Sequence, residues 1–175
     1  SDRANSWGFV GNDGPVFYFR TDKDAERGKL VSVTVRGNRG GDIASDEFVH
    51  ANRVWRNVVP QAAETLGGVQ MINDQFVTNY LKDAYTQIKI YDKDGKHIRD
   101  VEMPGIGSAG GFGGRQKDTE TFYTYSSFNA PPTIYRYDIV SRTSQVFRRS
   151  NVPGYDPERC VTTQVFYASK DGTRV

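Results

Sequence analysis

The stretch YTQIKIYDKDGKHIRDVEM, residues 85–103, decides the fold. Residues 85–92 alternate polar and apolar side chains, as a strand with one buried face does, and residues 97–103 begin polar and end apolar. The four residues between them, Lys-Asp-Gly-Lys at 93–96, include the Asp-Gly pair that favours a tight turn between strands. The stretch therefore predicts an antiparallel hairpin.

The pattern of this hairpin returns 46 residues later, in TIYRYDIVSRTSQVFR at residues 133–148. The aligned residues are Ile88, Ile90, Tyr91 and Asp92 in the first copy and Ile134, Arg136, Tyr137 and Asp138 in the second. Residues 29–35 fit the same slot earlier in the chain, with Val33 and Thr34 where the later copies have Tyr and Asp. The sequence therefore contains a repeated unit.

Working outward from these copies, short strand patterns separated by turn residues fall into three sets. They cover Ser6–Val10, Pro15–Thr21 and Lys29–Val35; Val69–Asn73, Gln75–Leu81, Tyr85–Asp92 and His97–Met103; and Ile106–Phe112, Glu120–Phe128, Thr133–Val140 and Ser144–Arg148. In the last set, Ala130-Pro131-Pro132 is expected to break the chain between the second and third strands. The only helical patterns are two short ones, Ser45–Val54 and Gln61–Leu66.

A four-stranded unit that repeats at roughly 40 to 45 residues is typical of a β-propeller blade, which buries its faces against neighbouring blades. We therefore predict an all-β chain of about three four-stranded antiparallel blades. The 37% hydrophobic and 25% charged residues also place the chain among globular proteins.

Charge and composition exclude several classes of function. The net charge is +2 with both signs scattered along the chain, so no basic patch for nucleic acid is expected. A single cysteine excludes an internal disulfide, and with only two histidines there is no cluster at metal-ligand spacing. No apolar run has the roughly 20 residues of a membrane helix. We expect a soluble chain, and the sequence leaves the compartment open between cytoplasm and periplasm.

Several motifs resemble chemical sites, and each has a plainer interpretation. Gly105, Gly107 and Gly110 satisfy GxGxxG, but no helix pattern follows, so we expect an innermost blade strand and no bound dinucleotide. Ser108 lacks the glycine two residues before it that a nucleophile elbow needs. Asp92–Gly95 begins like a calcium loop, but its glycine comes too early and the final glutamate is missing, which favours a hairpin turn.

The remaining candidates are reactive or aromatic side chains. His50 and His97 could act as general bases, but no activated nucleophile accompanies them and we expect solvated side chains. For the same reason Cys160 is expected to be a small, buried or semi-buried residue. The aromatic rows are expected to pack in the core; they comprise Phe17, Tyr18 and Phe19, and Phe122, Tyr123 and Tyr125. No catalytic, cofactor-binding or metal-binding residue is assigned.

Five strings in this sequence resemble the prolyl oligopeptidase family, in the family's order and with about its spacing. They are GNDGPVFYFRTDKDAERGKLVSV (11–33), VTNYLKDAYTQIKIYDKDGK (77–96), GFGGRQKDTETFYTYSSF (111–128), PPTIYRYD (131–138) and QVFYASKDGTRV (164–175). The resemblance covers nearly the whole chain. It implies a seven-bladed propeller that forms a lid over an α/β-hydrolase domain in a serine peptidase cutting after proline in short peptides.

The resemblance also implies a domain organisation. Residues 1–160 are expected to form a partial propeller with an irregular insert at 36–54. The insert is longer than the family's usual connection to a WRNVVP-like strand, which the resemblance places at Trp55–Pro60. Residues 161–175 resemble the first strand leading into the hydrolase domain, and that domain is expected to lie beyond Val175. The family's Ser, Asp and His, its proline-binding tryptophan and its substrate-clamping arginine belong to that domain, so no catalytic residue is carried over and whether this chain is an enzyme stays open.

These expectations give two alternative functions. In the first, the chain is the gating part of a proline-specific endopeptidase, and it selects peptide substrates by size while the hydrolase domain cleaves them. In the second, it is a free-standing scaffold or binding module. In either case we expect the isolated chain to self-associate or to pair with the missing blades, because a partial propeller leaves blade faces uncovered.

Overall fold

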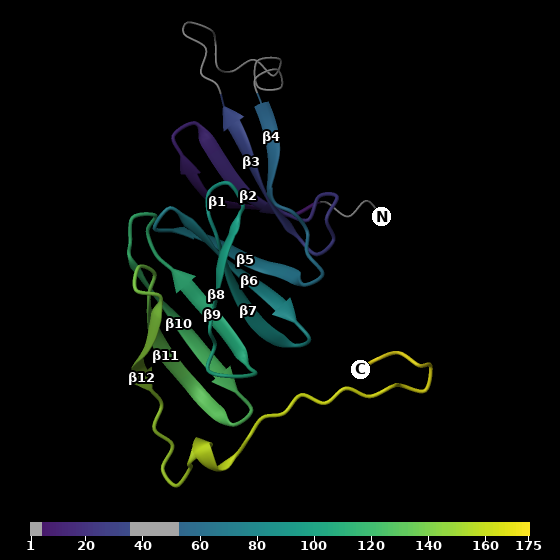
Figure 1. The fold of residues 1–175 in the computed structure, drawn as a ribbon, viewed down its shortest axis with the longest axis vertical. Coiled ribbons are helices and arrows are strands. Elements are labelled where there is room, and N and C mark those ends of the chain that lie inside the picture. The colour runs from purple at the N-terminus through teal and green to yellow at the C-terminus, as the bar shows by residue number, and fades with distance from the viewer. Residues whose placement is uncertain (1–4, 36–52) are drawn as a thin grey trace, which may run out of the picture.

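A computed structural model describes residues 5–35 and 53–175. Three four-stranded antiparallel sheets make up the fold, each a simple meander (Figure 1). The first sheet contains β1 (Trp7–Asp13), β2 (Val16–Thr21), β3 (Lys29–Val35) and β4 (Arg53–Val59); the middle sheet β5 (Thr65–Ile72), β6 (Gln75–Lys82), β7 (Tyr85–Tyr91) and β8 (His97–Val101); the last sheet β9 (Ser108–Gly113), β10 (Glu120–Ser127), β11 (Ala130–Asp138) and β12 (Thr143–Arg149). The predicted all-β fold of about three blades is confirmed.

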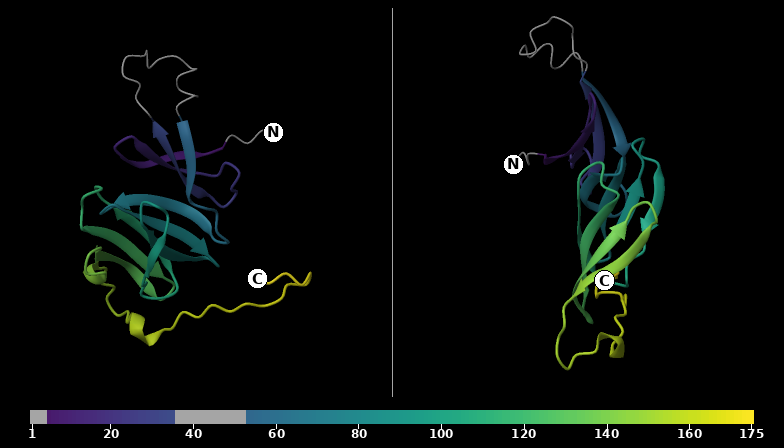
Figure 2. Two further views of the ribbon diagram at one scale, coloured as in Figure 1. Left: turned by 45° about the horizontal axis from the view of Figure 1, so that its top comes forward. Right: turned by 90° about the vertical axis from the view of Figure 1, so that its left-hand side faces the viewer.

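The sheets follow one another as a series in which each packs on the next, as the two views of Figure 2 show. Their first strands, β1, β5 and β9, contact one another in order. One apolar cluster joins the first and middle sheets and is centred on Leu30, Leu66, Phe76 and Tyr80. A second joins the middle and last sheets and is centred on Ile88, Ile90, Tyr123 and Tyr137. Within the described residues, the middle sheet is therefore covered on both faces, whereas each outer sheet is covered on one.

The two copies of the sequence repeat occupy equivalent positions in their sheets. The aligned copies lie on β7 and β11, the third strands of their sheets, and β3 occupies that slot in the first sheet. Asp92 Oδ1 accepts hydrogen bonds from the backbone N–H groups of Asp94 and Lys96, both at 2.9 Å. Asp138 Oδ1 accepts in the same way from Val140 at 2.9 Å and Ser141 at 2.7 Å. The repeated aspartate thus organises the turns that follow β7 and β11.

The helix predicted at Gln61–Leu66 is wrong. None of these residues is helical: residues 61–64 form a loop with a bend at 63–64, and β5 begins at Thr65. Arg27 holds them there: its backbone N–H donates to Gln61 Oε1 at 2.9 Å, its guanidinium to the Ala63 carbonyl at 2.6 Å, and its own carbonyl accepts from the Leu66 N–H at 2.7 Å. These long-range bonds outweigh the local helical preference.

Two further boundaries differ from the sequence-based expectation. Most of the predicted insert 36–54 and of the predicted helix Ser45–Val54 lies outside the described residues, and Arg53 and Val54 belong to β4. Ala130-Pro131-Pro132 does not separate two strands, because β11 begins at Ala130 and the turn lies just before it. Pairing of β11 with β12 starts at Thr133. The two prolines, which have no backbone N–H, therefore lie outside the paired part of these strands.

After β12 the chain leaves the sheets. It passes through a short 3₁₀ turn, η1 (Pro157–Arg159), and then runs extended across the ends of the last and middle sheets (yellow in Figure 1). Near its end an isolated bridge pairs Ala168 with Arg174. In the part of the chain with described structure, no helix is long and apolar enough to cross a membrane.

Candidate functional site

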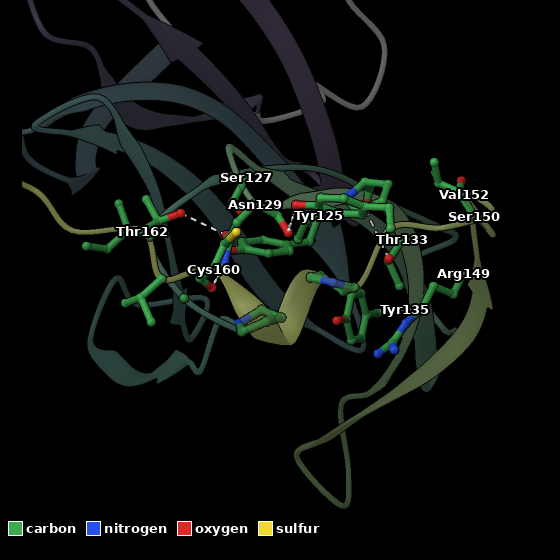
Figure 3. A pocket seen from close by; sticks show the side chains of 18 of the residues that line it. Tyr125, Ser127, Asn129, Thr133, Tyr135, Arg149, Ser150, Val152, Cys160 and Thr162 are labelled. Atoms are coloured by element: carbon green, nitrogen blue, oxygen red, sulfur yellow. Dashed lines mark hydrogen bonds between the residues drawn. The ribbon is translucent and has the colours of Figure 1, made fainter.

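The candidate site is a cavity of about 660 Å³ at the end of the last sheet, where the chain leaves β12 (Figure 3). Its walls come from three stretches that are far apart in the sequence: residues 104–106 before β9, the ends of β10 and β11 with their turn, and residues 149–162. A site built in this way depends on the path of the chain after β12.

Tyr125 and Tyr135 line the cavity, and Tyr123 packs behind them. Alternation along β10 turns Tyr123 and Tyr125 toward the middle sheet, where both are buried. The Tyr135 ring on β11 stacks on Tyr123 with centroids 5.1 Å apart and meets Tyr125 edge to face at 6.5 Å. Burial raises the pKa of Tyr125 above its usual value. The phenol therefore stays neutral across the physiological range.

Asn129, in the β10–β11 turn, is the polar centre of the site. Its Oδ1 accepts hydrogen bonds from Ser127 Oγ and Thr162 Oγ1, both at 2.7 Å, and its Nδ2 donates to the Cys160 carbonyl at 2.6 Å. Its own carbonyl accepts from Tyr155 Oη at 2.9 Å. Figure 3 shows Ser127, Cys160 and Thr162 gathered around this side chain, with Arg149 and Ser150 at the far side of the cavity.

The chemistry available here is hydrogen bonding and apolar contact. Arg149 is the single charged side chain among the described residues of the lining, which otherwise consists of hydroxyls, amides, prolines and small apolar groups. General acid–base catalysis needs a group that exchanges a proton near neutral pH, such as histidine or a perturbed carboxyl. The described lining thus has the features of a binding or packing surface.

The glycine-rich segment lies beside this site and serves close packing. A Cβ at Gly107 would overlap the Ser126 carbonyl and come within 2.8 Å of Tyr125 Oη, and one at Gly111, whose φ is +111°, would come within 2.9 Å of the Phe122 carbonyl. Gly110 and Ser108 lie on β9, the first strand of the last sheet. The segment is therefore the blade strand that the sequence predicted.

Of the reactive candidates, His97 and Cys160 lie in the described part of the chain, on β8 and on the segment after β12. His97 is exposed and pairs with Asp100 at 2.7 Å, whereas His50 lies outside the described residues. Cys160 is exposed, so the expected burial of its side chain is wrong: it lies on the segment after β12, outside the described sheets. Asp92–Gly95 forms the predicted hairpin turn. Among the described residues no three His, Cys, Asp or Glu side chains are close enough to hold a metal ion.

The aromatic rows are only partly in the core. Tyr18, Tyr123 and Tyr125 are buried as predicted. The other row of the first sheet is uncovered and forms an aromatic face, whose members are Trp7, Phe9, Phe17, Phe19 and Trp55. On the outer side of the last sheet, Phe122 contacts Phe147 edge to face at 5.0 Å, and both are exposed. The expectation of burial fails at the outer faces, where the described chain supplies no neighbouring sheet.

Comparison with known proteins points to one family. The family model for the prolyl oligopeptidase N-terminal β-propeller domain matches residues 2–150. The chain is 35% identical to a prolyl endopeptidase of Elizabethkingia miricola over 168 residues, which are 96% of this chain and 22% of that protein. It is 30% identical to the dual function macrocyclase-peptidase POPB of Galerina marginata over an alignment of 180 positions, which covers 100% of this chain and 23% of that protein.

Solved structures agree with these matches. The apo structure of prolyl oligopeptidase B from Galerina marginata aligns with a TM-score of 0.82 at 28% identity, over 99% of this chain and 24% of that chain. The chain therefore spans less than a quarter of the length of these relatives. From the family model, which covers most of the sequence, and the three four-stranded sheets, we conclude that this chain belongs to the prolyl oligopeptidase family and matches its N-terminal β-propeller domain.

Proposed function

We propose that the chain is the substrate-filtering part of a proline-specific serine endopeptidase that acts on short peptides. In this proposal residues 1–160 form part of the propeller and residues 161–175 lead into an α/β-hydrolase domain that carries the catalytic serine. The observation that carries it concerns the first strand of each sheet. The first strand β1 contacts β5, and β5 contacts β9, so these strands lie side by side along one edge of the three packed sheets. Strands placed in this way line the central channel of a propeller.

A channel lined by fixed strands would select substrates by size. A folded protein could not pass between rigid sheets, whereas a short extended peptide could, so the propeller would contribute specificity rather than bond cleavage. Relatives support this class of substrate: one structure of prolyl oligopeptidase B from Galerina marginata contains a 25mer macrocyclization substrate. In two prolyl endopeptidases whose structures have been compared, inter-domain dynamics have a role in catalysis and specificity.

The filter would depend on how firmly adjacent sheets are joined. The β7–β8 turn of the middle sheet grips the first sheet at two points: Lys93 Nζ lies 2.6 Å from Asp13 Oδ2, and Arg56 donates to Asp94 Oδ1 at 3.3 Å and to its carbonyl at 3.0 Å. If these contacts keep the channel narrow, removing them should admit longer substrates.

The test compares a short proline-containing peptide with the same sequence inside a peptide of about 60 residues, using the whole protein. The long peptide exceeds the 35mer substrate bound in a structure of prolyl oligopeptidase B from Galerina marginata. In the double variant Lys93→Ala/Arg56→Ala, kcat/KM for the long peptide should rise relative to the short one. Lys82→Ala, on the middle sheet itself, is the matched control and should leave the ratio unchanged. An unchanged ratio in the double variant would exclude the filter.

A second test uses the 175-residue chain alone. Hydrolysis of an amide needs an activated nucleophile, a base and an oxyanion hole, so incubation with a succinyl-Gly-Pro-anilide substrate should give the rate in buffer. Turnover that survives repurification and is lost in Ser108→Ala would contradict the assignment of cleavage to another domain.

One observation favours the alternative of a self-associating scaffold or binding module. The aromatic face of the first sheet exposes Phe9 by 61%, Trp55 by 48% and Trp7 by 47%, and contiguous apolar faces of this kind are typical of interaction surfaces. A preceding sheet, or a second copy of the chain, could cover it equally well.

A further inference from the structure

The segment that leaves β12, residues 150–164, forms a strap across the sheet ends. It begins beside Pro132, near the start of β11. It then turns through η1 and passes toward the middle sheet, as Figures 1 and 2 show. None of the described sheet ladders includes it, so its position must come from side-chain contacts.

The strap is held at three points, and the central one dominates. At its start Ser150 Oγ donates to the Pro132 carbonyl at 2.9 Å, and at its end Gln164 Nε2 donates to the Asp83 carbonyl in the β6–β7 turn at 2.6 Å. Between them, the Tyr155 hydroxyl, the Cys160 carbonyl and the Thr162 hydroxyl all bond to Asn129. One residue in the β10–β11 turn thus receives contacts from three places on the strap.

Apolar burial contributes little to this attachment. Val161 is 88% exposed, and Val152, Tyr155 and Cys160 are exposed as well. A segment held by a few hydrogen bonds with little buried apolar surface belongs to the part of a protein that opens at low free energy. The strap also forms one wall of the 660 Å³ cavity, so its release would open that cavity.

We propose that Asn129 is a latch that holds the strap on the propeller, and that its release frees the strap and opens the cavity beneath it. The amide suits this role because it presents an acceptor and a donor at one point, and here Oδ1 binds Thr162 while Nδ2 binds the Cys160 carbonyl. On the proposed function, the strap leads into the peptidase domain. Asn129 is then a positioning residue that sets how freely that domain moves against the propeller.

The first experiment measures the strap directly in the 175-residue chain. Cys160 is the single cysteine and is exposed, so a nitroxide spin label attached there reports the motion of the strap without further substitution. We expect Asn129→Ala to shift the spectrum to a more mobile component and Asn129→Asp, which keeps an oxygen but loses the donor, to give an intermediate shift. Asn12→Ala is the control, because Asn12 also bonds within a hairpin turn, to the Gly14 carbonyl, away from the strap.

Two results of the spin-label experiment would contradict the role of Asn129. A spectrum of Asn129→Ala that superimposes on that of the labelled parent chain would overturn the latch. If Asn129→Ala loses its β-sheet circular dichroism, Tyr155→Phe replaces it, since this variant removes one hydroxyl from the strap and leaves the turn intact. An unchanged label in a folded Tyr155→Phe/Thr162→Val double variant would overturn the latch in the same way.

The second experiment tests the coupling in the whole protein. Asn129→Ala should change kcat/KM for the long peptide of the filter test several-fold while leaving that for the short peptide near the parent value, and Asn12→Ala should change neither. If the spin label shows a mobile strap in Asn129→Ala but the ratio of kcat/KM for the long and short peptides is unchanged, the coupling to the peptidase domain is wrong. The filter itself is judged separately, by the Lys93/Arg56 variant, so failure of the latch and failure of the proposed function are distinguishable.

Discussion

At the scale of single residues, hydrogen bonds to one aspartate fix each of the two turns that follow β7 and β11. The Asp92 and Asp138 carboxylates accept the backbone N–H groups of their turns, and Gly95 in the first of these turns has φ of +83°. Gly95 also lies against the first sheet, because a Cβ there would overlap the Val58 carbonyl oxygen. The turn is therefore both a chain reversal and a contact between sheets.

Gly95→Ala should lower the free energy of unfolding by about 2–4 kcal/mol, since it combines a disfavoured φ with a backbone clash. The matched control is Gly14→Ala, whose φ is +54° but which has no atom within 4 Å of the added Cβ, and we expect a loss of about 1–2 kcal/mol there. Urea unfolding followed by tryptophan fluorescence measures both. Equal losses would show that the contact with Val58 relaxes without penalty.

The Asp138 carboxyl makes the free energy of unfolding depend on pH in the acid range. Hydrogen bonds from the Ser141 and Val140 backbone lower the pKa of this carboxyl below its usual 3.8. Its stabilising contribution is therefore present above that usual pKa and is lost as pH falls through the lower value in the folded state. Asp138→Asn keeps the oxygen acceptor but cannot ionise, so its stability should fall less steeply than that of the parent chain between about pH 4 and pH 2. Identical acid-unfolding curves would contradict this role.

At the scale of elements, the strands could be predicted from the sequence because their pattern is local. Alternation and turn residues located the three sets, and the 46-residue repeat placed β7 and β11 in the same slot. The helix predicted at 61–66 is wrong because Arg27, which is distant in the sequence, holds this segment in a loop that leads into β5. The cavity could not be predicted either, since it forms only where the segment after β12 folds back onto Asn129.

Contacts between sheets include one partly buried arginine whose loss should be measurable. Arg99 on β8 donates to Tyr137 Oη at 3.2 Å and to the Ile139 carbonyl at 2.9 Å, both in the last sheet. Arg99→Met should destabilise the chain by about 1–3 kcal/mol, because it leaves buried acceptors without a donor. Arg136→Met is the control: Arg136 pairs with Glu120 on the exposed face of one sheet, and we expect less than about 1 kcal/mol. Comparable losses would show that Arg99 does not join the sheets.

At the scale of the whole molecule, the two outer faces determine how the chain associates. The aromatic face of the first sheet and the outer face of the last sheet, with Phe122 and Phe147, have no cover within the described residues. Exposed apolar area contributes about 25 cal/mol per Å² when buried, so two uncovered faces favour association.

Sedimentation equilibrium of the 175-residue chain at micromolar concentration should therefore show assemblies larger than the 19.6 kDa monomer. The variant Phe9→Thr/Phe19→Thr should shift the population toward monomer while leaving the sheet content unchanged, since threonine is also a good strand former. Ile98→Thr on β8, an exposed apolar residue of the covered middle sheet, is the control. A monodisperse parent monomer would refute the role of these faces.

The serial packing of the sheets has a consequence for how such chains arise. The middle sheet packs one face against the first sheet and the opposite face against the last, so it separates the two apolar clusters. Duplicating a gene segment that encodes one sheet would therefore add a further copy of an existing interface and leave the others untouched. Propellers can in this way gain or lose whole blades over evolutionary time, and the constraint on the number of blades comes from ring closure rather than from any single sheet.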